Sequence, residues 1–268
     1  MFLLKKAPTE HLDTGICIEV LPLSERMLAA SRWQGLEKRL GNTTLKNSWC
    51  WINTWLDHFT RVTHDGCAVP CVFIFGVAQN QDVGAALLPV SYFDLGVLTV
   101  PTVAIGTAGE PLRERTYIQY NQLLVEPGYL NAFAQGLMSY LVKQKWSVLW
   151  IECFLPLHAE ALIEAGQNTG LSLTVIEEPL PTFDFGQLSP GEEIWRGISH
   201  DQRSKIRRSM KQFTASFGPL SIEWATTRVQ AQNILDELIE LHTNQWLCKG
   251  DPGSFRTQRL RDYHKQLV

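Results

Sequence analysis

The stretch VPCVFIFGVA, residues 69–78, is followed by a polar QNQD turn at residues 79–82 and by VGAALLPVSYF, residues 83–93. Both apolar runs are rich in β-branched and aromatic residues, and a short polar segment between two such runs is typical of a hairpin. We therefore predict two paired strands here. A third predicted strand over Val97–Ile105 extends them into a meander.

Two helices are predicted before this meander, after a strand over Ile16–Leu21. Ser24 caps the first helix, and Asn47 or Ser48 caps the second. The apolar positions of the first helix are Ala29, Trp33, Leu36 and Leu40. Those of the second are Trp49, Trp51, Ile52, Trp55, Leu56 and Phe59. The second set covers almost half of the helix circumference, so we expect this helix to be deeply buried, with its tryptophans packed in the core.

Helices and strands alternate after the meander. We predict a strand over Tyr117–Val125, a helix over Tyr129–Lys145, a strand over Val148–Cys153, a helix over Leu157–Asn168 and a strand over Leu171–Ile176. A similar order then starts again, with a strand over Thr182–Phe185, a capped helix from Ser189, a basic helix over Ser199–Phe217, a strand over Leu220–Trp224, a helix over Arg228–Leu247 and a final helix. This order predicts a first lobe over residues 1–180 and a partial second lobe over residues 181–268.

The composition is that of a globular chain. Its 268 residues are 45% hydrophobic and 19% charged, which excludes a disordered protein. The net charge of −3 argues against a dedicated nucleic-acid binder. We expect no signal peptide and no bilayer-spanning segment, and therefore a soluble, cytoplasmic protein with reduced thiols. Cys67 and Cys71 have no partners at metal spacing, and we predict no metal site.

The basic helix over Ser199–Phe217 carries two stripes. An apolar stripe, expected to face a core, consists of Ile206, Met210, Phe213 and Phe217. A cationic stripe consists of Arg203, Arg207 and Lys211, with Arg208 beside it. The cations form either a solvated helix face or a grip for the phosphates of an anionic ligand, because charge-assisted hydrogen bonds are stronger than neutral ones.

Short segments carry a resemblance to a known family. They are NSWCWINTW (47–55), ALLPV (86–90), TAGEP (107–111), IQYN (118–121), SKIRRS (204–209) and LHTNQWLCKG (241–250). With the order of predicted elements, they resemble the FemAB-like branch of the GNAT acyltransferase superfamily, and within it the acetyltransferases grouped with cellulose-biosynthesis CelD/BcsL proteins. The resemblance runs from residue 30 to the C-terminus and depends on the shared order of the motifs.

The resemblance implies an α/β (α+β) fold of GNAT type, in which a mixed, mostly antiparallel sheet is flanked by helices and a second such lobe begins. It also implies transfer of an acyl group from acetyl-CoA or another acyl-CoA to an amine of a sugar, peptide or small metabolite. In this interpretation the phosphates of coenzyme A bind Arg203, Arg207, Arg208 and Lys211.

His242 lies on an apolar helix face with Trp246. It is either a buried histidine with its N–H satisfied or the general base that takes the proton of the amine. Gln119 and Asn121 share one face of a predicted strand, where they line a substrate cleft or are solvated at a sheet edge. Trp246 and Lys249 complete the residues that we predict to line the cleft.

The chain departs from the family in three places. The turn EPGYLNAFAQG (126–136) lacks the G-x-G spacing that brings backbone N–H groups to a pyrophosphate, so the first lobe is not expected to hold coenzyme A in the usual manner. Gln119 stands where relatives carry an acidic residue. The second lobe of the family continues beyond the position of Val268, so the chain is expected to be C-terminally truncated. The alternatives to an acyl-CoA enzyme are therefore a non-catalytic remnant and a FemAB-like transferase that uses aminoacyl-tRNA.

Overall fold

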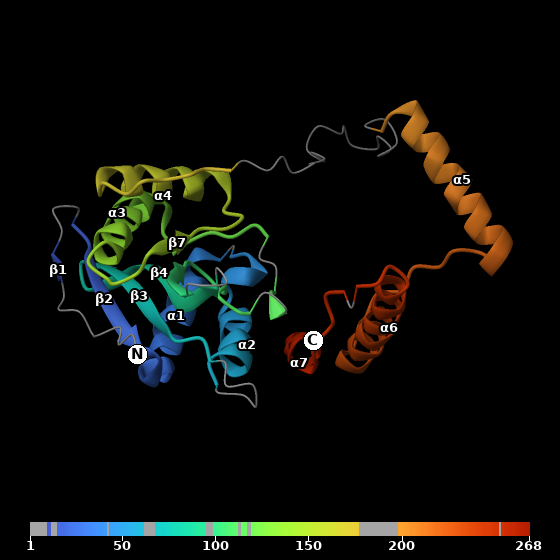
Figure 1. Ribbon diagram of the computed structural model, residues 1–268, viewed down its shortest axis with the longest axis horizontal. Coiled ribbons are helices and arrows are strands. Elements are labelled where there is room, and N and C mark those ends of the chain that lie inside the picture. The colour runs from blue at the N-terminus through green and yellow to red at the C-terminus, as the bar shows by residue number, and fades with distance from the viewer. Residues whose placement is uncertain are drawn as a thin grey trace. The chain divides into compact units, whose positions relative to one another are not determined.

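The structure is a computed structural model that describes residues 10–11, 15–41, 43–61, 68–94, 99–111, 114–116, 119–176, 198–251 and 253–268. Within these residues a mixed, mostly antiparallel sheet is flanked by helices, which confirms the predicted fold class (Figure 1). The strands are β1 (Glu10–His11), β2 (Cys17–Pro22), β3 (Cys71–Ala78), β4 (Gln81–Asp94), β5 (Thr99–Ala104), β6 (Leu124–Val125) and β7 (Val148–Trp150). The helices are α1 (Arg26–Leu40), α2 (Trp49–Phe59), α3 (Leu130–Leu141), α4 (Pro156–Asn168), α5 (His200–Phe217), α6 (Arg228–Leu247) and α7 (Gln258–Leu267).

The predicted hairpin is the centre of the sheet. The strand order is β1-β2-β3-β4-β5-β7, and β6 pairs with β4 beside this path. The pairs along the path are antiparallel up to β5, whereas β5 and β7 are parallel. The long strand β4 pairs with β6 near its start and with β5 near its end. Because β5 and β7 are parallel, the segments that follow them leave the sheet at the same end.

Each face of the sheet has its own core. Helices α3 and α4 cover one face, and α1 and α2 cover the other (Figure 1). Of the two predicted caps of α2, Asn47 and Ser48, it is Ser48 that accepts a hydrogen bond from Trp51 N. The second core also contains Leu260 and Tyr263 of α7, from the far end of the chain. The last helix thus helps to complete the core that the first two helices begin.

A pair of glycines lets α3 lie close to the sheet. Gly76 of β3 pairs directly with Gly84 of β4. The buried ring of Phe133 from α3 packs against both glycines, where no Cβ atom projects from the sheet. A Cβ atom at Gly84 would lie 2.7 Å from Cγ of Phe133, and one at Gly76 would lie 2.6 Å from Cδ2 of that ring. Only glycine fits at these two positions without moving Phe133.

We expect Gly84→Ala to lower the free energy of unfolding by about 1–3 kcal/mol, because the added methyl group overpacks a closed core. The matched control is Gly128→Ala, where a Cβ atom would meet nothing within 4 Å. Urea unfolding of both variants measures the difference. Equal stabilities for the two variants would show that Phe133 moves away at little cost.

Contacts divide the chain into two units. The first contains Met1–Leu173 and Ala231–Val268, and the second contains Thr174–Gln230, which includes α5. The predicted division into a lobe over residues 1–180 and a partial second lobe over residues 181–268 stays a prediction. Among the described residues, no helix is long and apolar enough to cross a bilayer.

Three predicted strands differ from the structure. Leu171–Ile176 and Leu220–Trp224 form no strand, and their large apolar side chains such as Ile176 and Trp224 are exposed. Within Tyr117–Val125, where residues 117 and 118 lie outside the described residues, only β6 forms. Apolar alternation gives a strand only where a neighbouring strand offers hydrogen bonds, and among the described residues no strand pairs with Leu171–Ile176 or Leu220–Trp224. The strand predicted over residues 182–185 and the cap at residue 189 also lie outside the described residues.

Candidate functional site

The candidate site begins where the parallel strands β5 and β7 end. The carboxyl ends of parallel strands are a frequent position for ligand sites in α/β proteins. Glu110 and Glu114 lie on the segment that follows β5, and Glu152 follows β7. Three carboxyl groups thus gather at one edge of the sheet.

Glu110 is the most unusual of these carboxyl groups. It is 8% exposed, and its Oε1 atom accepts hydrogen bonds from Trp55 Nε1 and Thr116 Oγ1, both at 2.6 Å. Burial raises the pKa of Glu110, although these hydrogen bonds and the nearby Arg115 oppose the rise. A raised pKa means that Glu110 holds a proton more tightly than an exposed glutamate does, which makes it a candidate general base.

Lys46 is electrostatically coupled to Glu110. It lies in the single helical turn Leu45–Asn47 before α2, and its Nζ atom is 3.6 Å from the centre of the Trp51 ring. Burial lowers the pKa of Lys46 to about 8, although the Glu110 carboxylate favours the charged form. The Trp51 ring is itself held by a hydrogen bond of 2.8 Å from Nε1 to Thr107 Oγ1. Trp51 and Glu110 therefore define a place for an ammonium group.

Helix α7 packs against this place. Tyr263 is fully buried, and its ring makes edge contacts with Trp51 at 5.3 Å and Phe59 at 5.7 Å. Among the described residues its hydroxyl group has no hydrogen-bond partner. Burial raises the pKa of Tyr263, and Glu110 adds to the rise. Burial also lowers the pKa of His264, and the charge of Lys46 adds to that shift.

Two ion pairs hold the segment that carries Glu110. Arg259 of α7 binds Glu114 at 2.5 Å, and both side chains are largely buried. Arg115 pairs with Glu152, which also accepts a hydrogen bond of 3.2 Å from Trp150 Nε1. Because the pairs tie the segment to α7 and to the end of β7, they limit the positions that Glu110 can take.

Asn121 is placed differently from the prediction. It is 2% exposed, and its Nδ2 atom donates to the carbonyl oxygens of Ile105 and Glu152. Its backbone also pairs with Cys153 and Leu155. Asn121 therefore joins the segments that follow β5 and β7 rather than lining an open cleft. Gln119 is exposed, so the two residues do not share one face as a regular strand would require.

His242 and its two predicted neighbours do come together on α6 and the turn that follows it. The His242 ring lies 5.8 Å from that of Trp246 and 5.2 Å from that of Phe255, and Nζ of Lys249 lies 4.8 Å from the Trp246 ring. His242 Nδ1 is buried and has no partner among the described residues. No hydrogen bond or ring contact in the described part of the chain joins this group to Gln119 or Asn121. The role of His242 as a base stays a prediction.

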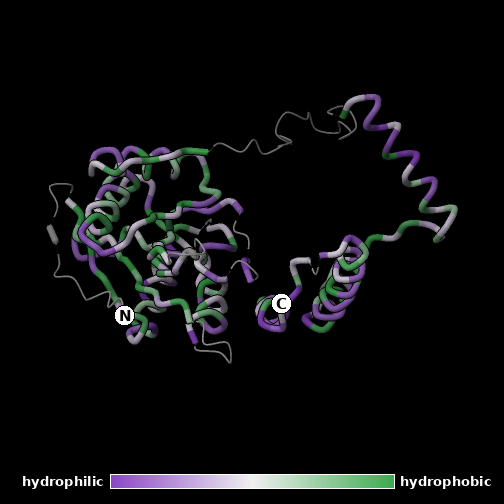
Figure 2. The backbone as a smooth tube through the Cα atoms, viewed as in Figure 1, coloured by the Kyte–Doolittle hydropathy of each residue, from purple (hydrophilic) through white to green (hydrophobic). Residues whose placement is uncertain are grey.

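The predicted phosphate-binding cations lie on α5, in the second unit. Within that unit α5 buries no residue, so its apolar stripe covers no core there, and Figure 2 shows the helix as mostly hydrophilic. In the described part of the chain, Arg203, Arg207, Arg208 and Lys211 form no ion pair. Unpaired cations in a row fit the charge of coenzyme A phosphates. By contrast, the turn before α3 carries Glu126, paired with Arg39 at 3.3 Å, and a carboxylate there opposes a pyrophosphate.

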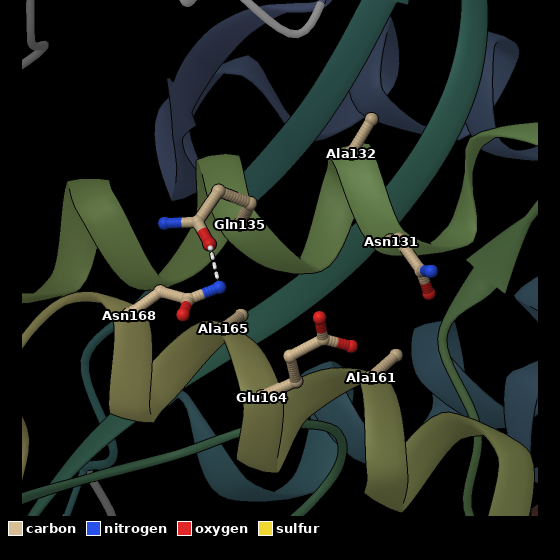
Figure 3. Close-up of a pocket in the computed structure, with 7 residues that line it drawn as sticks. All are labelled: Asn131, Ala132, Gln135, Ala161, Glu164, Ala165 and Asn168. Atoms are coloured by element: carbon tan, nitrogen blue, oxygen red, sulfur yellow. Dashed lines mark hydrogen bonds between the residues drawn. The ribbon is translucent and has the colours of Figure 1, made fainter.

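A groove of about 320 Å³ lies between α3 and α4 (Figure 3). Its lining consists of Asn131, Ala132, Gln135, Ala161, Glu164, Ala165 and Asn168. Asn168 Nδ2 donates to Gln135 Oε1 across the groove at 3.3 Å. The amide groups and alanines offer contacts for binding, and Glu164 is the one ionisable side chain of this lining. The groove therefore lacks the combination of a buried carboxyl group and a nearby lysine that the site around Glu110 has.

Among the described residues, no group of acidic, histidine and cysteine side chains is arranged to hold a metal ion. Cys71 is a buried thiol whose pKa burial raises to about 12, as expected of an inert core cysteine. Cys67, the cysteine four residues before it, lies outside the described residues.

No protein-family profile matches the chain, and no curated protein matches it. An aminoglycoside acetyltransferase from an uncultured soil metagenomic sample, solved with trehalose, is 10% identical, with a TM-score of 0.36, over 65% of this chain and 100% of its own. A ribosomal-protein-alanine N-acetyltransferase from Brucella melitensis biovar Abortus 2308 is 10% identical, with a TM-score of 0.34, over 63% of this chain and 99% of its own. A probable acetyltransferase is 16% identical, with a TM-score of 0.31, over 62% of this chain and 98% of its own.

The fold and the site together define a mixed α/β protein with a buried carboxyl group and a lysine at the carboxyl ends of its parallel strands. At these identities and TM-scores the solved structures add no functional detail, so the function depends on the chain's own residues.

Sequence patterns miss the three residues at the centre of the site. Glu110 lies inside the TAGEP segment that carries the family resemblance, and a single acid within an apolar and glycine-containing stretch is the signal that was available. Lys46 and Tyr263 carry no such signal. Their roles depend on a turn before α2 and a helix at the end of the chain meeting in one core.

Proposed function

We propose that this chain is an N-acyltransferase that moves an acyl group from a coenzyme A thioester to an amine of a sugar, a peptide or a small metabolite. The observation that carries the proposal is Glu110, a buried carboxyl group with a raised pKa beside an ammonium position on Trp51. The family resemblance of the TAGEP segment supports the same chemistry.

The chemistry needs a group that removes a proton from the amine. An amine is protonated near neutral pH and cannot attack until it loses that proton. The Glu110 carboxylate, which is buried and hydrogen-bonded to Trp55, is the group that accepts this proton. The neutral amine then attacks the thioester carbonyl carbon, a C–N bond forms, the C–S bond breaks, and the thiolate leaves and takes up a proton.

The direct test is release of free thiol from acetyl-CoA by the full 268-residue chain. The acceptors are glucosamine, spermidine and a peptide with a free N-terminus, each tested against a reaction without an amine. We expect amine-dependent thiol release with at least one of them, and calorimetric binding of acetyl-CoA in the micromolar range. No thiol release and no heat of binding at millimolar acetyl-CoA would overturn the proposal and favour a non-catalytic remnant.

The cations of α5 distinguish the acyl-CoA enzyme from the transferase that uses aminoacyl-tRNA. Binding of acetyl-CoA that is weakened by Arg207→Glu supports phosphate capture by α5. Binding of tRNA that falls steeply with salt and is lost in the same variant supports the tRNA-dependent alternative instead.

A further inference from the structure

We propose that α5 lies flat on the surface of an anionic lipid bilayer, with its apolar stripe at the edge of the hydrocarbon and its cations among the headgroup phosphates. The inference goes beyond the proposed acyl transfer and concerns the second unit of the chain alone. It turns on an apolar stripe that is open to solvent and on a set of cations that form no ion pair in the described part of the chain.

The apolar stripe of α5 consists of Ile206, Met210, Phe213 and Phe217, and no residue of α5 is buried. Phe217 is 78% exposed, and Met210 and Phe213 are each close to half exposed. The rings of Phe213 and Phe217 contact each other, with 5.1 Å between their centres, so the stripe ends in a continuous aromatic surface. A helix that leaves such a stripe in water is stabilised when a bilayer interface covers it.

The charge of α5 is strongly positive. Its sequence contains Asp201 as the only acidic residue, against Arg203, Lys205, Arg207, Arg208 and Lys211. Among the described residues, none of these cations forms an ion pair. Because the whole chain has a net charge of −3, the surplus of positive charge is local to this helix. The charge complement of such a helix is an anionic surface.

The positions of the cations suit a helix that lies in the plane of a membrane. At about 100° per residue, Arg207 lies about 90° from the centre of the apolar stripe and Lys205 about 110° from it on the other side. Side chains of this length reach the phosphates while their methylene groups lie along the apolar surface. Asp201, at about 150° from the centre of the stripe, faces away from it.

The segment that follows α5 adds to the apolar surface of the second unit. Its large apolar side chains are exposed, and they are Leu220, Ile222 and Trp224. Trp224 is the most exposed of the three. Tryptophan is enriched at membrane interfaces, where its apolar ring enters the lipid and its N–H group stays hydrated. Trp224 therefore fits the same interface and reports on it through its fluorescence.

Two other partners explain only part of α5. A nucleic acid attracts the cations through its phosphates but leaves the apolar stripe uncovered. A second copy of the chain, packed stripe to stripe, covers the apolar side chains but brings the cations of two helices together, and like charges repel. A bilayer that contains anionic lipids is complementary to both surfaces at once.

The experiment mixes the folded chain with vesicles of phosphatidylcholine, either alone or with about one-third phosphatidylglycerol, and measures binding by co-sedimentation. We expect binding to the anionic vesicles, and we expect salt to weaken it. Arg207→Glu should weaken this binding at least about fivefold, because one cation near an anionic surface contributes about that much. Lipids with brominated chains should quench part of the tryptophan fluorescence, and Trp224→Phe should remove this part.

Phe213→Asp and Ala215→Asp form a matched pair of variants. Both add one negative charge to α5, but Phe213 lies in the stripe, whereas Ala215 lies about 170° from its centre. We expect Phe213→Asp to weaken vesicle binding at least about tenfold more than Ala215→Asp does, since only the first removes a ring from the lipid. Because both positions are exposed, circular dichroism should show a folded chain in each variant.

The inference is wrong if anionic vesicles at millimolar lipid and low salt bind no better than neutral ones. It is also wrong if the two aspartate variants bind vesicles equally, because the stripe would then contribute nothing. A dimer that Phe213→Asp dissociates, seen by sedimentation velocity without vesicle binding, would show that a second copy covers the stripe. Acetyl-CoA binding that Arg207→Glu weakens, again without vesicle binding, would assign the cations to the proposed function instead. Vesicle binding does not depend on acyl transfer, so the two proposals fail separately.

Discussion

Glu110→Gln is expected to lower amine-dependent thiol release by about 10²–10⁴-fold, the range for loss of a general base. Glutamine has nearly the same size, and its amide oxygen can still accept the hydrogen bonds from Trp55 and Thr116. The side chain can no longer take a proton from the amine. Steady-state kinetics should therefore show a fall in kcat with little change in the far-ultraviolet circular dichroism spectrum.

The pH dependence gives this prediction a second readout. Glu110 accepts a proton only when it is ionised, and burial raises its pKa. The activity of the natural chain should therefore fall on the acid side at a pH above the usual range of glutamate, and the variant should lack this fall. Activity should rise as pH passes through the pKa of Glu110, whereas the contribution of Glu110 to folding stability should fall. A raised pKa means that the folded state binds the proton more tightly, so the contribution of Glu110 to stability is present at low pH and is lost as pH rises through its folded pKa.

Two further variants control the interpretation. Glu164→Gln removes a carboxylate from the groove between α3 and α4 and should leave turnover unchanged. His242→Gln tests the base that the sequence predicts. If His242→Gln abolishes turnover while Glu110→Gln does not, the proton acceptor is His242 and the assignment of Glu110 is wrong.

Tyr263→Ala is expected to lower the free energy of unfolding by about 3–5 kcal/mol, the range for loss of a large ring from a core. Tyr263 is fully buried and touches Trp51 and Phe59 from α2 as well as His58. Its removal would leave a cavity between α2 and α7. Chemical unfolding measures the loss, and Trp224→Ala, at a tryptophan that is 83% exposed, is the control, with an expected change within about 0.5 kcal/mol.

Tyr263→Phe separates the ring from its hydroxyl group. The hydroxyl has no partner among the described residues, so its removal should change stability by less than about 1 kcal/mol or even raise it. A loss above 2 kcal/mol would point to a hydrogen bond that forms in solution. A variant of normal stability that turns over more slowly would place the hydroxyl against the substrate.

The elements that the sequence predicts well have their cause within a few residues. Ser48 caps α2, and the turn between β3 and β4 falls at Gln79–Asn80, since β4 already begins at Gln81. Ser199 and Gln202 form a capping box at the start of α5. Each of these depends on local hydrogen bonds or on the alternation of apolar residues. The predicted cap Ser24 is wrong, because Ser24 lies in a 3-10 turn and α1 has no side-chain cap. The wrong strand predictions depend on distant residues: Leu171–Ile176 has the composition of a strand, but no strand in the described part of the chain pairs with it.

In the candidate site, too, groupings that come from local spacing are predictable, and those that depend on distant residues are not. His242 with Trp246 and Lys249 follows from helical spacing, and the structure does bring these three together. Asn121 is a polar residue in a predicted strand, yet its amide nitrogen donates hydrogen bonds to the backbone carbonyl oxygens of Ile105 and Glu152. A side chain's type is visible in a sequence, but its hydrogen-bond partners are not.

By itself, the sequence determines the hairpin, the Ser48 cap of α2 and the cationic stripe of α5, because neighbouring residues specify them. Only the tertiary structure decides that Lys46, Glu110 and Tyr263 share one buried site, although the first and the last are more than two hundred residues apart. The physical reason is that a pKa depends on burial and on nearby charges, and both arise only when α2, α7 and the segment after β5 close on one another.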